Sequence, residues 1–428
     1  MNKTGLVAGG VILAVAIAAP WAVGMVTEKQ WHQVTAEVNA SQPFVRLETG
    51  DYQRGYLGGR VEGTLVVDDP AAEEPVQFDY QARVSHGVTG SLLEFSAVDG
   101  LPEAAGRLFT EEKPRLTLET RLWGTAIVEL TVPAVSVADA QTGQSLSLSG
   151  GFARADIGDA GREADITLVW PGMTVAGPDM TLTLDELRLE QSLSHLSGEV
   201  WTGEGEAVLG SLEVAAPGQP PLRFESFNMS SRTWAGDHDS RVSGETVATL
   251  ETVIAGDEAF GPHRLEFVMR DLHVGSWSEL TGALTDLQVA AMDQGGSPAA
   301  FEQQMASMGR LNEALLGLAA HGFEFGFADL RVMTPEGEIS GQAMIGHPAL
   351  SEEERSQMLM VMQRLTGQVA FSLPVALAEN YPALRLQLAP LIKQGMLVEQ
   401  GDRLNLNARL EDMALDVNGV IIPLPPLL

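Results

Sequence analysis

Few residue types in this chain are able to carry chemistry, and they are scattered. The densest polar cluster is Asp237-His238-Asp239, which lies between Gly236 and Ser240. Carboxylate and imidazole groups at this spacing can ligate a divalent cation, but a loop tip supplies too few ligands without partners from elsewhere in the chain. An exposed turn is the preferred interpretation, and a metal- or carboxylate-dependent hydrolase around this cluster is the alternative.

The eight histidines form no known catalytic motif. They stand at positions 32, 86, 195, 238, 263, 273, 321 and 347. The sequence contains no His-Glu-x-x-His pattern, phosphate-binding loop or Gly-x-Ser-x-Gly elbow. His86, between Ser85 and Gly87, is a possible general base, but the sequence offers no nucleophile to pair with it, and a polar strand end is the preferred interpretation. We assign no catalytic, cofactor-binding or metal-binding residue, and we expect a protein that is not an enzyme.

Composition restricts the partners of the chain. Its 428 residues include 57 acidic and 26 basic side chains, which gives a formal net charge of -31. This charge repels phosphate backbones, so nucleic-acid binding is excluded. The absence of cysteine excludes disulfides, thiolate metal sites and cysteine nucleophiles. The acidic residues are spread along the chain, which is typical of a solvated surface.

One segment near the N-terminus has the composition of a membrane anchor. The 22 residues from Gly5 to Val26 carry no charge. A helix of this length reaches across a hydrocarbon core of about 30 Å, because it satisfies its own backbone hydrogen bonds. Lys3 before the segment, and Glu28 with Lys29 after it, predict a cytoplasmic N-terminus and an exported body. A signal peptide cleaved near Ala16-Ile17-Ala18 is the alternative.

Alternating apolar residues indicate that the body is rich in β-strands. The clearest run places apolar side chains at 76, 78, 80, 82 and 84, on one face of a half-buried strand. Beyond Glu119, apolar residues recur at k, k+2, k+5 and k+7. Copies of this pattern begin at Leu130, Leu168, Leu182, Leu222, Phe267, Phe325 and Ala408. Because k and k+5 differ by an odd number, one extra residue is needed to bring both pairs to the same face, which is a β-bulge.

The predicted bulges indicate a large, curved and mostly antiparallel sheet with one apolar face. They fall at Pro133-Ala134, Pro171-Gly172, Asp185-Glu186, Glu225-Ser226, Arg270-Asp271, Ala328-Asp329 and Glu411-Asp412. Chance matches within a large β protein are the alternative explanation of the pattern.

Helical signals follow residue 293. Ser297-Pro298 begins a helix that contains Met305 and ends before Gly322, and its apolar residues are interpreted as core rather than as a lid. A capping box at Ser351 to Glu354 opens a second helix, with Leu359 and Met362 on its apolar side. A third helix is predicted from about Pro382 to Gly395. Strands are expected at Val369 to Leu373 and around the turn at Asn418-Gly419.

These signals define the expected fold class. It is α+β and β-dominated, with an N-terminal transmembrane helix and with the other helices concentrated in the C-terminal third. The expected parts are an anchor over 1–30, a β-rich region over 31–292 and a mixed α+β region over 293–428 that continues the same sheet.

Several segments together resemble the YdgA-like family of bacterial envelope proteins, whose domain has no known function. They are Met1-Asn2-Lys3 with the apolar segment, Tyr52-x-Arg54-Gly55, His86-Gly87, Leu365 to Val375, and Val417-Asn418-Gly419 with its proline-rich end. The chain departs from the family pattern at Val88-Thr89, where relatives continue with proline and an apolar residue. The resemblance implies a single-pass inner-membrane anchor through residues 5–26, a periplasmic body and possible self-association, and it brings no catalytic residue. The strand-rich part from Leu182 to Thr233 is similar to AsmA-like envelope proteins, whose sheets carry lipid.

The sequence therefore supports two functions from different classes. The first is a non-catalytic envelope protein that scaffolds a protein partner or shelters a lipid acyl chain along its sheet. The second is a periplasmic hydrolase that uses carboxylates or a metal near Asp237-His238-Asp239. A passive structural tether is a third possibility.

Overall fold

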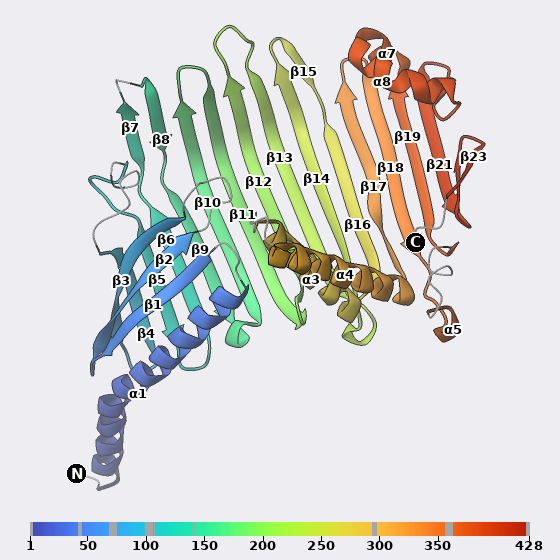
Figure 1. The fold of residues 1–428 in the computed structure, drawn as a ribbon. Coiled ribbons are helices and arrows are strands. Elements are labelled where there is room, and N and C mark those ends of the chain that lie inside the picture. Colours follow the sequence, from blue (N-terminus) through green and yellow to red (C-terminus); the bar gives the residue numbers. More distant parts are fainter. Residues whose placement is uncertain are drawn as a thin grey trace. The chain divides into compact units, whose positions relative to one another are not determined.

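The computed structural model describes residues 3–41, 45–67, 75–98, 106, 108–139, 142–292, 298–355 and 363–424. Contacts divide the chain into two compact units. Unit 1 is Met1–Pro178 with Arg188–Ser192, and unit 2 is Asp179–Leu187 with Leu193–Leu428. Each unit is an antiparallel sheet with few helices (Figure 1).

Unit 1 begins with helix α1 (Lys3–Ser41), whose side chains are described from Ala19 onward. Within the part of the chain that the structure describes, no helix is long and apolar enough to cross a membrane. The prediction of a transmembrane helix over Gly5–Val26 is corrected accordingly, although the side chains of residues 5–18 lie outside the described residues. Near the end of the predicted span Val23 is fully buried, whereas Trp21 and Met25 are exposed. Thr27, just after the span, forms a hydrogen bond with Ser91 of the sheet.

The sheet of unit 1 is a meander in which successive segments pair in order. Its strands are β1 (Val45–Arg54), β2 (Gly58–Val67), β3 (Val76–His86), β4 (Gly90–Ala97), β5 (Arg115–Arg121), β6 (Ala126–Val132), β7 (Val135–Asp139), β8 (Gln144–Leu148), β9 (Gly151–Gly158) and β10 (Glu163–Ala176). A 3-10 turn, η1 (Asp159–Gly161), joins β9 to β10. β6 with β7 forms one interrupted strand, and β8 with β9 forms the next, since β7 pairs with β8, β6 with β9, and β10 with both β8 and β9.

The predicted alternation in β3 is confirmed, and it directs one face of the strand toward α1. Tyr80, Ala82 and Val84 are buried there. Trp31 of α1 lies on this face, with its ring 6.4 Å from that of Tyr80 and 5.9 Å from that of Phe95. α1 therefore covers the apolar side of β1 to β4.

Unit 2 continues as a second meander with helical insertions. β11 (Thr181–Ser197) has residues in both units and leads into β12 (Val200–Ala215), β13 (Leu222–Ala235), β14 (Arg241–Ala255), β15 (Glu258–Phe260), β16 (His263–His273), β17 (Phe323–Thr334), β18 (Gly337–His347), β19 (Thr366–Pro374), β20 (Val398–Gln400), β21 (Arg403–Glu411), β22 (Ala414–Val417) and β23 (Val420–Pro423). β14 pairs with both β15 and β16, and β19 pairs with β21. All of the strand pairs described in unit 2 are antiparallel.

The helices of unit 2 lie at the ends of its strands. α3 (Val274–Met292) and α4 (Pro298–His321) connect β16 to β17 and lie across one end of β12 to β16 (Figure 1). α5 (Glu352–Arg355) precedes β19, and α7 (Val375–Asn380) with α8 (Pro382–Lys393) connects β19 to β20. Because α1 is long and α3 begins before residue 293, helices are not concentrated in the C-terminal third, and that prediction is wrong.

Several local predictions are confirmed. α4 begins at Pro298 and ends before Gly322, whose φ is 83°. Ser351 and Glu354 form the capping box, with the Ser351 amide donating to the Glu354 carboxylate at 3.0 Å and the Glu354 amide donating to the Ser351 hydroxyl at 3.4 Å. Leu359 and Met362, predicted for the same helix, lie outside the described residues.

The predicted bulges have mixed outcomes. The bulge at Arg270-Asp271 is confirmed, because the pairing register with β14 shifts between Val242 and Gly244. The bulge at Ala328-Asp329 is also confirmed, because the register shifts there against both β16 and β18. Glu186 and Ser226 adopt left-handed backbone conformations inside their strands, with φ of 56° and 55°. Glu411-Asp412 is instead the hairpin turn between β21 and β22, because Asp412 and Met413 both have positive φ.

Candidate functional site

One face of the unit 2 sheet is lined by apolar side chains from strand to strand. Cross-strand partners lie on the same face of a sheet, so the register identifies its members. A first row runs through Ala207, Met229, Ala248, Leu265, Leu330, Gly341, Phe371 and Leu406. A second row runs through Gly205, Ser231, Thr246, Phe267, Phe327, Ala343, Val369 and Ala408. We call this surface the apolar face of unit 2.

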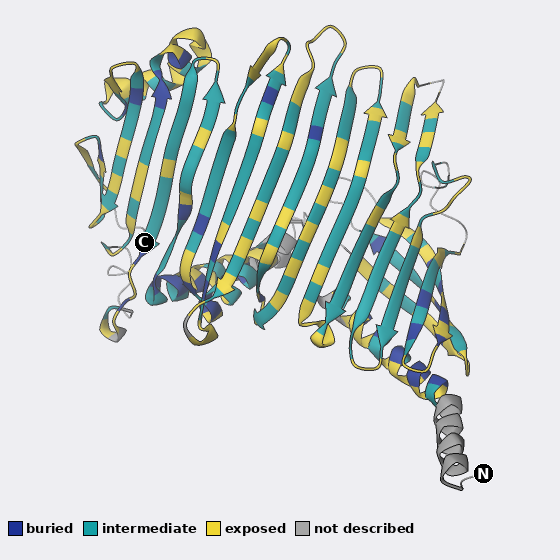
Figure 2. Ribbon diagram, turned by 180° about the vertical axis from the view of Figure 1, so that it is seen from behind, coloured by how far each residue is buried: buried dark blue, intermediate teal, exposed yellow. Residues whose placement is uncertain are grey.

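The opposite face is polar. A row on that face runs through Val208, Asn228, Thr249, Arg264, Arg331, Ser340, Ser372 and Asn405. Arg264 and Arg331 both pair with Asp329 there, at 3.3 Å and 3.0 Å. Figure 2 shows this side with bands of exposed residues along the strands. The sheet of unit 2 is therefore amphipathic across its thickness.

The central part of the apolar face is open to solvent. Figure 1 shows that the helices of unit 2 lie at the ends of its strands and leave the middle of β12 to β17 uncovered. Phe327 is 43% exposed and Val369 38%. Unit 1 provides the contrast, because Val61, Ala82 and Leu93 are fully buried where α1 covers a similar face. A contiguous exposed apolar surface of this kind marks a binding site more often than a free surface.

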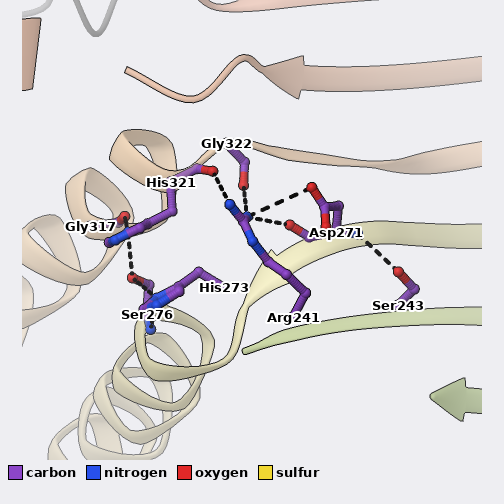
Figure 3. Close-up of polar contacts among 8 residues, drawn as sticks. All are labelled: Arg241, Ser243, Asp271, His273, Ser276, Gly317, His321 and Gly322. Carbon is purple, nitrogen blue, oxygen red and sulfur yellow. Dashed lines mark hydrogen bonds and ion pairs between the residues drawn. The ribbon is translucent and has the colours of Figure 1, made fainter. Parts of the chain in front are cut away.

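A polar clasp holds the α3–α4 hairpin on the end of this face (Figure 3). Arg241, at the start of β14, donates to the carbonyl oxygens of Asp271 at 2.8 Å and His321 at 2.9 Å. It also donates to the Gly322 carbonyl at 3.5 Å. One guanidinium therefore joins the end of β16 to the end of α4. We call this set, with His273 and Ser276, the Arg241 clasp.

Two histidines meet inside the Arg241 clasp. The rings of His273 and His321 stack with centroids 3.8 Å apart and planes at 9°. His321 Nδ1 donates to the Gly317 carbonyl at 2.8 Å, and His273 Nδ1 accepts the Ser276 amide at 3.3 Å, which caps the first turn of α3. The Ser276 hydroxyl contacts both rings, at 3.1 Å and 3.3 Å.

The clasp brings together a serine and two histidines, but its geometry favours structure over catalysis. Ser276 is buried, so a substrate carbonyl has no access to its hydroxyl. The hydroxyl faces Nδ1 of both rings, and each Nδ1 also bonds to helix backbone. Nucleophilic catalysis needs an accessible hydroxyl beside a free base. Sequence reasoning missed this cluster because its two histidines are 48 positions apart.

The structure separates the residues that the sequence singled out. Asp237–Asp239 forms a 3-10 turn, η2, between β13 and β14, and His238 and Asp239 are exposed. Among the residues that the structure describes, no three metal-binding side chains come together. His86 ends β3 and is buried under α1, with Nδ1 2.8 Å from the Ser91 hydroxyl. Met305 and Met308 of α4 are exposed rather than part of the core, so their predicted role in the core is wrong.

The fold and the site define an antiparallel sheet protein with an open apolar face. The chain belongs to a bacterial protein family of unknown function, DUF945, whose family model matches residues 1–425. No curated protein and no solved structure matches the chain. The similarity to AsmA-like proteins therefore has no structural support.

Proposed function

We propose that the protein is a non-catalytic binding body that holds lipid acyl chains against the apolar face of unit 2. The observation that carries this proposal is that neighbouring strands from β12 to β21 present apolar side chains on one side, and that the described helices leave their middle uncovered. Burying such side chains contributes about 25 cal/mol per Å² of apolar area.

The chemistry of the face favours an acyl chain over a polypeptide. Protein interfaces carry about one hydrogen bond per 100–200 Å², whereas the first row contains no polar side chain and the second contains only Ser231 and Thr246. The first row crosses eight strands, from β12 to β21, and covers about 34 Å at about 4.8 Å between neighbouring strands. A lipid chain spans about 15 Å, half of a hydrocarbon core, so it fits along this stretch.

Substituting Phe327 with glutamate is expected to reduce bound lipid about tenfold, because a carboxylate on the apolar face opposes contact with hydrocarbon. Phe327 is 43% exposed, so the change leaves the core intact. The measurement is native mass spectrometry of the purified full chain, with lipid extraction to quantify phospholipid per protein. Ser230→Glu is the matched control, since Ser230 lies on the opposite face of β13 and is exposed.

Two results would contradict acyl-chain binding. One is a wild-type protein that carries no lipid and takes up none from phosphatidylcholine vesicles. The other is equal lipid content in Phe327→Glu and Ser230→Glu. A wild-type protein that is dimeric and free of lipid, with Phe327→Glu monomeric, would assign the face to a second copy of the chain instead.

We also propose that the protein is a YdgA-like envelope protein whose body lies outside the cytoplasm. The motif resemblance and the uncharged leading segment support this location. Protease added to intact spheroplasts should digest the body, and protection until lysis would contradict the location. The alternative of a hydrolase near Asp237–Asp239 predicts a bound metal ion in elemental analysis, which the binding-body proposal does not require.

A further inference from the structure

α1 contacts the sheet of unit 1 through one stripe of buried residues. Val23, Thr27, Trp31 and Thr35 recur every four positions and are all buried, which is the spacing of one helix face. Trp31 packs into the apolar cluster of β1 to β4, whereas Thr27 lies against polar groups from the ends of β3 and β4. The contact therefore has an apolar half and a polar half.

The polar half is a chain of hydrogen bonds whose direction is fixed. The Thr27 hydroxyl donates to the Val23 carbonyl at 2.9 Å, so its oxygen must accept from Ser91, 2.7 Å away. The Ser91 hydroxyl has then used its proton and must accept from His86 Nδ1 at 2.8 Å. Nδ1 of His86 therefore carries a proton, and in the neutral ring the lone pair lies on Nε2.

Nε2 of His86 points at α1 and has no hydrogen-bond partner among the described residues. The atom is buried, and His86 is only 7% exposed. A methyl group built on Gly24 of α1 would lie 2.9 Å from Nε2, so helix backbone closes over it. A proton added to Nε2 would be a buried cationic donor without an acceptor among the described residues, which destabilises the docked state unless the groups separate.

The charged groups that face His86 do not offset this cost. Arg54 of β1 lies beside it, and its guanidinium pairs with Glu28 of α1 at 2.8 Å. Burial lowers the pKa of His86, and the positive charge of Arg54 lowers it further. Glu28 is already engaged by Arg54, so a protonated His86 would add a second cation to a site with one carboxylate.

Two other polar atoms in the contact between α1 and the sheet also favour the undocked state of α1. Trp31 Nε1 and Tyr52 OH are buried, and no described residue offers either of them a hydrogen bond. Burial raises the pKa of Tyr52 to about 12, with Glu28 adding to the shift and Arg54 opposing it. Undocking of α1 would return these groups to water and recover part of their hydration.

We propose that α1 is a removable cover of the apolar face of β1 to β4, and that protonation of His86 releases it. The proposal rests on unit 1 alone and does not depend on lipid binding by unit 2. The direction of the pH dependence follows from the linkage between proton binding and undocking. The undocked state, with an ordinary histidine pKa near 6.5, binds the proton more readily, so the docked state loses stability as the pH falls below that value.

Hydrogen exchange of the full chain tests the release directly. Between pH 7.5 and pH 5.5, amides of residues 23–35 should exchange about tenfold faster after correction for intrinsic rates, because pH 5.5 lies about one unit below the ordinary histidine pKa and protonation then favours the undocked state about tenfold. A hydrophobic dye should bind more at pH 5.5, because the apolar cluster of β1 to β4 becomes exposed. His86→Asn keeps a donor for Ser91 but cannot be protonated here, so it should remove this response.

Two further variants control the interpretation. His238→Asn, in the exposed turn, should keep the full pH response. The chain has no cysteine, so Thr27→Cys with Ser91→Cys offers a single disulfide that locks α1 and should keep residues 23–35 protected at both pH values. Equal protection of the wild type at both pH values would overturn the proposal. So would an unchanged response in His86→Asn, or opening of the locked variant at pH 5.5.

Discussion

Replacement of Leu318 by alanine is expected to lower the free energy of unfolding by about 3–5 kcal/mol. Leu318 of α4 is 1% exposed and packs with Leu272 of β16 and Leu280 of α3 beneath the helical hairpin. The smaller side chain leaves a cavity there, because strands and helices cannot all move inward together. Urea unfolding monitored by circular dichroism measures the change.

Leu315→Ala is the matched control, because Leu315 lies three residues earlier in α4 and is 48% exposed. Its substitution is expected to change stability by less than about 1 kcal/mol. The same loss in both variants would mean that α4 does not pack through the face that contains Leu318. Stability measured for the unit 1 transition should be unaffected by either variant.

Replacement of Arg241 by alanine is expected to destabilise the α3–α4 hairpin by about 2–4 kcal/mol. The guanidinium donates to carbonyls at the end of β16 and at the end of α4, and its loss leaves those carbonyls without their charged donor. Hydrogen exchange should show faster opening of residues 274–321, while β18 and β19 stay protected.

The Arg241→Lys variant distinguishes the contribution of the positive charge from that of the hydrogen bonds made by the planar guanidinium. A lysine keeps the positive charge but is a point donor without the planar fork that reaches several carbonyls, so most of the loss should remain. Full recovery by lysine would show that charge near the last turn of α4, rather than hydrogen bonding, stabilises the hairpin. His238→Asn, in the turn just before β14, serves as the nearby control.

The sequence predicted elements whose causes are local. Pro298 and Gly322 mark the ends of α4. Ser351 and Glu354 form the predicted capping box at the start of α5, because capping depends on residues three or four positions apart. The turn at Asn418-Gly419 is also confirmed, with positive φ at both residues. Register shifts at Asp271 and Asp329 bear out two of the predicted bulges.

The errors arose where distant packing decides the outcome. α3 was missed because apolar residues from Phe267 to Val274 continue a strand pattern, and the helix begins at Val274. The transmembrane span was predicted at Gly5–Val26 because this segment contains no charged residue. The absence of charge does not distinguish a helix that faces lipid from one that packs on a sheet through Val23.

The candidate site was predicted only in part. An apolar face followed from alternation, but which of its parts stay open depends on where α3, α4, α7 and α8 lie. The Arg241 clasp could not be foreseen, because residues 241, 273 and 321 meet only after β16 and β17 pair and the hairpin folds back.

The meander order of both sheets bears on how the protein is made. Because chain neighbours are sheet neighbours, each hairpin can close soon after its second strand leaves the ribosome or a translocation channel. The main exception is β16, whose partner β17 follows only after the α3–α4 hairpin. Until β17 has been made, the outer edge of β16 presents unpaired backbone groups that could pair with another chain.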